Sequence, residues 1–105
     1  MTTHTLDNAL AEEAAKDLLG VYRRPGGWAT GGFRSKLIEA WNVADNGNHA
    51  RLSMAFPELG FVIELFQGGF YELVQNIAEG SLAASDVRRG LGTLSRAASE
   101  LDNKN

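Results

Sequence analysis

The stretch Leu52–Phe66, LSMAFPELGFVIELF, decides whether this chain is helical or built from strands. Its apolar residues recur at intervals of three and four, which is the spacing of one face of a helix. The pattern continues across Pro57, whose ring and missing N–H are tolerated in the first turn of a helix but not in its interior. We therefore expect two helical segments, the first ending at Phe56 and the second beginning with Pro57.

Upstream, the same spacing predicts an amphipathic helix over about Leu6–Arg23. Thr5 or Asp7 is placed to accept a backbone N–H bond at its start, and Pro25 ends it by disfavouring helical geometry in the preceding residue. The apolar stripe of this helix repeats every four residues, at Leu6, Leu10, Ala14, Leu18 and Tyr22, and is widened by Ala11, Ala15 and Leu19.

Further helices are expected on both sides of the central stretch. One begins near Phe33 and stops near the DNGN turn at residues 45–48. A short helical segment follows over residues 70–77, and a last helix is capped at residues 85–86 and reaches Leu101.

The sequence thus predicts an all-α fold, a compact bundle of four to five short helices in a single domain. At 105 residues, of which 44% are hydrophobic and 22% charged, the chain is long enough to bury one core. We expect the domain to span residues 1–105, with frayed ends at about 1–5 and 102–105.

The composition argues against several classes of protein. With no cysteine, the chain has no disulfide framework, cysteine-based zinc site or thiol nucleophile. A net charge of −3 makes nucleic acid an unlikely partner, because such binding depends on clustered Lys and Arg. The most apolar run, Leu59–Phe66, is interrupted by Glu64 and is too short to cross a membrane. We therefore expect no membrane contact.

The glycine-rich stretch Gly26–Phe33, GGWATGGF, resembles a phosphate-binding loop only in its spacing. Gly32 and Phe33 occupy the positions where such a loop needs Lys and Ser or Thr. We interpret the stretch as a pliant connection between helices, with Thr30 as the N-cap of the next helix. Trp28 is expected to cover the edge of the core, or alternatively to project as an anchor for a partner.

No catalytic residue, metal site or cofactor is predicted. His4 and His49 are the only histidines, and neither has further ligands at metal-binding spacing. A triad of Ser35 or Ser53 with His49 and Asp45 would need a strained nucleophile turn that the sequence does not show. We therefore expect a protein that is not an enzyme.

The remaining candidates are surfaces for binding. The aromatic residues near the centre are most simply core, but exposed members would serve a partner or a homo-oligomer. The candidate partner contacts are Trp28, Gly27, Arg24, Phe61, Phe70 and Tyr71. The alternative, an anion site, would use one of two clusters, Arg23 and Arg24 or Arg88 and Arg89, although we favour solvated surface charge as the explanation of these arginines.

Residues 31–66 contain a motif that combines GGF and KLIEA with AD, a nearby Asn and AFPE. The motif resembles a family of small proteins of tailed bacteriophages and prophages. The resemblance covers about a third of the chain and implies a phage or prophage origin and a bacterial cytoplasmic location. It carries no known activity and no catalytic residues.

The leading hypothesis is a small helical phage or prophage accessory factor that binds a host or phage protein and inhibits or redirects a defence or regulatory system. Two alternatives remain open. One is an oligomeric binder of a small anionic ligand such as a nucleotide. The other, which the charge disfavours, is a helical nucleic-acid-binding module.

Overall fold

The computed structural model describes residues 6–90, which form six helices and no strand. Five of the helices are α1 (Asn8–Val21), α2 (Gly32–Val43), α3 (Asn46–Ala55), α4 (Pro57–Gln67) and α5 (Tyr71–Ala78). A sixth helical segment covers residues 84–90 and begins just before the expected cap. The all-α prediction is confirmed, while the expected count of four to five helices is too low. The predicted helix beyond residue 90 and the frayed ends at 1–5 and 102–105 lie outside the described residues.

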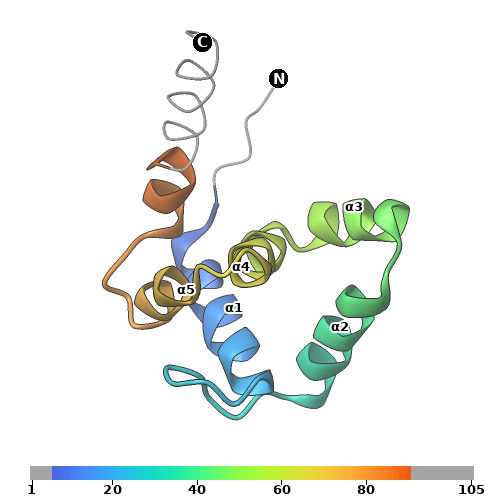
Figure 1. Cartoon of the computed structure of the whole chain (residues 1–105), viewed down its shortest axis with the longest axis horizontal. Helices are drawn as coiled ribbons and strands as arrows, with labels where there is room; N and C mark the ends of the chain where they lie inside the picture. Colours follow the sequence, from blue (N-terminus) through green and yellow to red (C-terminus); the bar gives the residue numbers. More distant parts are fainter. Residues whose placement is uncertain (1–5, 91–105) are drawn as a thin grey trace, which may run out of the picture.

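The core is formed where α1 packs against α4 and α5, and α2 and α3 form an arm that leaves this trio and returns to α4 (Figure 1). The trio supplies most of the buried apolar side chains among residues 6–90. From the arm, only Ile38 and Trp41 of α2 are fully buried, and α3 contributes no buried residue. The arm therefore depends on a few contacts with the trio.

The buried face of α1 is narrow and rich in small side chains. Asp7 caps the helix, because its Oδ1 accepts a hydrogen bond from the backbone N–H of Leu10 at 3.1 Å. Alanine positions allow neighbouring helices to approach closely, which suits a helix that contacts both α4 and α5. The buried apolar residues of α1 are Ala11, Ala14, Ala15, Leu18 and Leu19.

The chain breaks between α3 and α4 as the position of Pro57 predicts. Phe56 has non-helical backbone angles, φ −133° and ψ 71°, and separates the two helices, and Pro57 occupies the first turn of α4. One turn later, a Cβ on Gly60 would lie 3.1 Å from Ser53 Oγ and 3.2 Å from Trp41 Cζ2. The lack of a side chain at Gly60 thus lets α3 and the indole of Trp41 close against α4.

Candidate interaction surface

The C-terminal ends of α1 and α4 are closed by two turns of the same type, with the same pattern of backbone hydrogen bonds. After α1, the Arg23 N–H donates to the Gly20 carbonyl at 3.1 Å and the Arg24 N–H to that of Leu19 at 2.9 Å. After α4, the Gly69 N–H donates to the Phe66 carbonyl at 3.1 Å and the Phe70 N–H to that of Leu65 at 2.9 Å. This pair of bonds defines the Schellman motif, which satisfies the last carbonyl groups of a helix.

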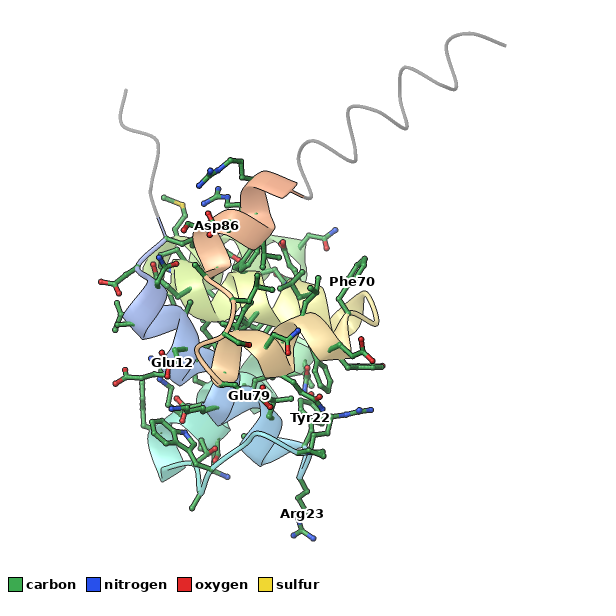
Figure 2. The ribbon with its side chains drawn as sticks, turned by 90° about the vertical axis from the view of Figure 1, so that its left-hand side faces the viewer. Glu12, Tyr22, Arg23, Phe70, Glu79 and Asp86 are labelled. Atoms are coloured by element: carbon green, nitrogen blue, oxygen red, sulfur yellow. The ribbon has the colours of Figure 1, made fainter. Side chains whose placement is uncertain are left out.

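The left-handed residue of the turn differs between these ends. Gly69 fills it after α4 with φ +87°, and Gly80 fills the corresponding position after α5 with φ +80°. After α1 the position is filled by Arg23 with φ +54°, the only non-glycine residue of the described chain at positive φ. A residue with a Cβ is disfavoured in this conformation by roughly 1 kcal/mol. Figure 2 shows the Arg23 side chain pointing away from the body of the protein.

The two turns bring aromatic side chains together from different helices. The Tyr22 ring stacks on the Phe66 ring with centroids 4.8 Å apart. The Phe66 ring in turn meets the edge of Tyr71 at 5.0 Å. We call this region the aromatic–arginine surface, and it consists of Tyr22, Arg23, Arg24, Phe66, Phe70 and Tyr71.

Arg24 lies across these rings and is held by them. Its guanidinium carbon lies 4.1 Å from the centroid of Tyr71 and 5.3 Å from that of Phe66, within the range of cation–π attraction. Tyr22 is held as well, because its hydroxyl accepts a hydrogen bond from Asn42 Nδ2 of α2 at 2.6 Å. The surface is therefore ordered by contacts from α1, α2, α4 and α5.

Much of this aromatic area is open to solvent. Tyr22 is 39% exposed, Phe70 47% and Tyr71 38%, although all three are large side chains. Tyr22 and Phe70 lie along the same side of the molecule in Figure 2. The arrangement presents apolar rings and a fixed cation to an approaching molecule, with little side-chain entropy left to lose on binding.

The glycine-rich loop has a different role, because it folds back over α1. The Trp28 Nε1–H donates to Asp17 Oδ1 at 2.6 Å, and the Trp28 backbone N–H donates to the Lys16 carbonyl at 3.3 Å. A Cβ on Gly20 would overlap the Trp28 carbonyl, and one on Gly27 would overlap the Gly20 backbone. The close approach at this crossing thus requires glycine at both positions, so Gly27 is explained by packing.

Trp28 covers the edge of α1, which is the first of the two roles that the sequence suggested, and its role as an anchor for a partner stays a prediction. Its indole N–H is bound to the buried Asp17, and the Lys16 ammonium lies 5.0 Å from its ring centroid, so the side chain is anchored on α1. Its side chain nevertheless remains 45% exposed. Asp17 also forms an ion pair with Arg34 of α2, with Arg34 Nε 3.6 Å from Asp17 Oδ2. This carboxylate therefore connects both the glycine-rich loop and the arm to α1.

The other predicted contacts lie elsewhere. Phe61 is separated from the aromatic–arginine surface and lines a cleft of about 480 Å³ beside α3 and α4. Arg88 lines the same cleft, and Arg89 pairs with Asp86 at 2.8 Å. Figure 2 places Asp86 and Arg23 at opposite ends of the molecule. The two arginine pairs therefore remain two separate candidate anion clusters, as the sequence presented them.

The residues considered for catalysis and metal binding have structural contacts. Asp45 caps α3, because its Oδ1 accepts from the Asn48 N–H at 2.8 Å. The His49 ring packs at the edge of Trp41, with centroids 6.4 Å apart. Within residues 6–90, no group of three His, Cys, Asp or Glu side chains is placed to hold a metal ion.

Sequence reasoning missed two members of the surface, Tyr22 and Phe66, because both were assigned to buried stripes. Their positions were the available signal, because Tyr22 directly follows α1 and Phe66 lies in the last turn of α4, and side chains there lie at the rim of a bundle.

No helix in the described part of the chain is long and apolar enough to span a membrane. The chain matches no protein-family model, no curated protein and no solved structure.

Proposed function

We propose that this chain is a non-enzymatic binding protein that contacts another protein through the aromatic–arginine surface. One observation carries the proposal: Tyr22, Phe70 and Tyr71 are each more than a third exposed, and the Arg24 guanidinium lies 4.1 Å from the centroid of the Tyr71 ring. Tyr and Arg are enriched among the residues that dominate protein–protein binding energy. Exposed groups of apolar side chains in small proteins commonly mark such interfaces.

The wider proposal is a phage or prophage accessory factor that acts in the bacterial cytoplasm by binding a host or phage protein. Its support is the motif within residues 31–66. In this proposal, binding inhibits or redirects a defence or regulatory system. The surface itself is built mostly outside the motif, by the ends of α1 and α4 and the start of α5.

The experiment compares capture of bacterial proteins by the full chain and by a Phe70→Ser, Tyr71→Ser variant. Met54→Ser is the matched control, because Met54 is another exposed apolar side chain but belongs to α3. Loss of a captured protein with the double variant, and its retention with Met54→Ser, is the expected result. Identical capture by all three chains would refute the proposed surface.

Light-scattering mass after size exclusion separates a foreign partner from self-association. The proposal expects a monomer whose surface is free for another protein. A stable oligomer that dissociates in the Phe70→Ser, Tyr71→Ser variant would assign the surface to a symmetric interface instead.

A second candidate function is an oligomeric binder of a small anionic ligand. The observation that favours it is that neither Arg23 nor Arg24 has an ion-pair partner among residues 6–90. A rise in melting temperature with one member of a nucleotide panel would support this candidate, because a ligand that binds only the folded state stabilises it.

A further inference from the structure

We infer that the aromatic–arginine surface recognises an acidic protein segment that carries large apolar side chains. This inference rests on the proposed function and specifies the chemistry of the partner. The apolar side chains would pack on the exposed rings of Tyr22, Phe70 and Tyr71, and the carboxylates would pair with Arg23 and Arg24.

The first argument is charge. Several basic side chains of the described chain have carboxylate partners of their own, including Lys16 with Glu12 and Arg34 with Asp17. Arg23 and Arg24 have none within 4.0 Å among residues 6–90, although acidic residues outnumber basic ones 13 to 10 in the full sequence. The protein thus leaves two adjacent cations uncompensated beside its exposed aromatic rings, and a negatively charged segment complements them.

The second argument is preorganisation. The rings of Tyr71 and Phe66 hold the Arg24 guanidinium, whose carbon lies 4.1 Å and 5.3 Å from their centroids, so the side chain is restrained before a partner arrives. A planar guanidinium with fixed orientation suits bidentate binding of a carboxylate. Less side-chain entropy is then lost on binding than for a free arginine.

The third argument is the position of Arg23. The same turn is completed by Gly69 after α4 and by Gly80 after α5, so the backbone has no need of arginine there. Arg23 occupies a conformation that glycine adopts without strain, and it projects its charge into solvent (Figure 2). A residue that is unfavourable for the turn but exposes a charge next to Arg24 is explained by binding.

The surface suits a peptide segment better than a small anion. The described cleft of about 480 Å³ is lined by residues such as Phe61 and Glu64 and none from the aromatic–arginine surface. Small ligands are usually enclosed in pockets, whereas extended protein segments bind on open surfaces with anchoring side chains.

The test is selection of a library of short random linear peptides on the immobilised full chain, followed by affinity measurement of the enriched peptides. We expect enrichment of Asp and Glu around Trp, Phe or Leu. The affinity of such a peptide should fall about tenfold with Arg24→Gln, because a hydrogen-bonded charge pair is lost. Arg23→Gly, which keeps the turn intact, should weaken binding about two- to fivefold.

Arg51→Gln is the matched control, because Arg51 is an exposed arginine of α3 and is bonded to Asn48. This variant should bind like the original chain. Raising NaCl from about 50 to about 500 mM should weaken peptide binding to the original chain and affect Arg24→Gln less.

Several results would overturn the inference: enrichment of neutral or basic peptides, failure to enrich any peptide, or equal binding by the Arg24→Gln and original chains. Tighter binding of a DNA oligonucleotide at the same arginines would assign them to phosphate and overturn it too. The proposed function fails separately, when capture of bacterial protein is unchanged by Phe70→Ser, Tyr71→Ser. If that capture is lost while the arginine variants behave normally, only the acidic partner is refuted.

Discussion

The ends of α1 and α4 form the same hydrogen-bonded turn, but the chain uses them differently. After α4, the left-handed residue is Gly69 and the chain enters α5 two residues later. After α1, the left-handed residue is Arg23 and the chain doubles back across the helix before α2 begins at Gly32. The first end is a simple connection, whereas the second combines an unfavourable residue with a tightly packed loop.

The difference shows where the sequence departs from the choice that favours stability. The backbone requires the turn at both ends, so glycine would serve at both. The α1 end instead places Arg23 and Arg24 beside the rings that the α4 end supplies. Departures of this kind are expected at sites selected for binding, because stability is offset elsewhere in the fold.

The largest effect is expected where the loop crosses α1. In Gly20→Ala, the new Cβ would overlap the Trp28 carbonyl, so the loop must move away from the helix. We expect the free energy of unfolding to fall by roughly 3 kcal/mol, as measured by urea denaturation. The control is Gly32→Ala, where a Cβ meets nothing within 4 Å. Equal stability of the two variants would show that the crossing is not tightly packed.

The next effect concerns the carboxylate that holds this loop. Asp17→Ala removes the acceptor of the Trp28 Nε1–H at 2.6 Å and leaves Arg34 without its ion pair. We expect a loss of about 2 kcal/mol in the free energy of unfolding, with a red shift of tryptophan fluorescence as Trp28 becomes more hydrated. Asp86→Ala is the control, because its pair with Arg89 is on the surface and contributes about 0.5 kcal/mol or less. An Asp17→Ala variant as stable as the control would contradict the anchoring role.

A smaller effect is expected at the α4 end. Gly69→Ala should lower the free energy of unfolding by about 1 kcal/mol, because alanine is disfavoured at φ +87°. Gly32→Ala is again the matched control, since both positions have open space around a Cβ but Gly32 does not have a positive φ. Thermal unfolding of the two variants isolates the cost of the left-handed backbone, and identical melting temperatures would refute it.

The helices were predictable because their signals are local. The division at Pro57 is confirmed, and Asp7 and Asp45 cap α1 and α3 through hydrogen bonds to residues three positions on. Such contacts depend only on neighbouring residues, so the sequence contains all the information that they need.

The five buried apolar residues of α1 all belong to the predicted stripe, whereas Leu10 and Tyr22 of that stripe are exposed. A series with strict four-residue spacing turns about 40° further around the helix at each step, because four residues span roughly 400°. Leu10 therefore leaves the buried face and is 45% exposed, and Tyr22 lies beyond the last helical residue, Val21. Spacings that alternate between three and four, as in Ala11, Ala14 and Leu18, stay on one side.

Contacts between distant residues could not be read from the sequence. Thr30 was expected to cap α2, but Gly31 is the N-cap, and the Thr30 hydroxyl donates to the Asp17 carbonyl at 2.9 Å. Arg24, Phe70 and Tyr71 were recognised as candidates, whereas their convergence with Tyr22 and Phe66 depends on how α1 crosses α4. That crossing is set by packing of whole helix faces, which no local pattern records.

The smallest expected effect is a gain in stability, and it tests most directly the comparison between the turns that follow α1 and α4. Arg23→Gly should raise the free energy of unfolding by about 0.5 to 1 kcal/mol, because glycine relieves the strain at φ +54° and outweighs its greater freedom in the unfolded chain. Denaturant unfolding measures this change, with Arg51→Gly in α3 as a control that should instead lose about 1 kcal/mol. In a double variant, Arg23→Gly should restore the stability that Gly69→Ala alone loses. A destabilised Arg23→Gly chain would mean that the arginine itself holds the turn, and the case for its role in binding would then be lost.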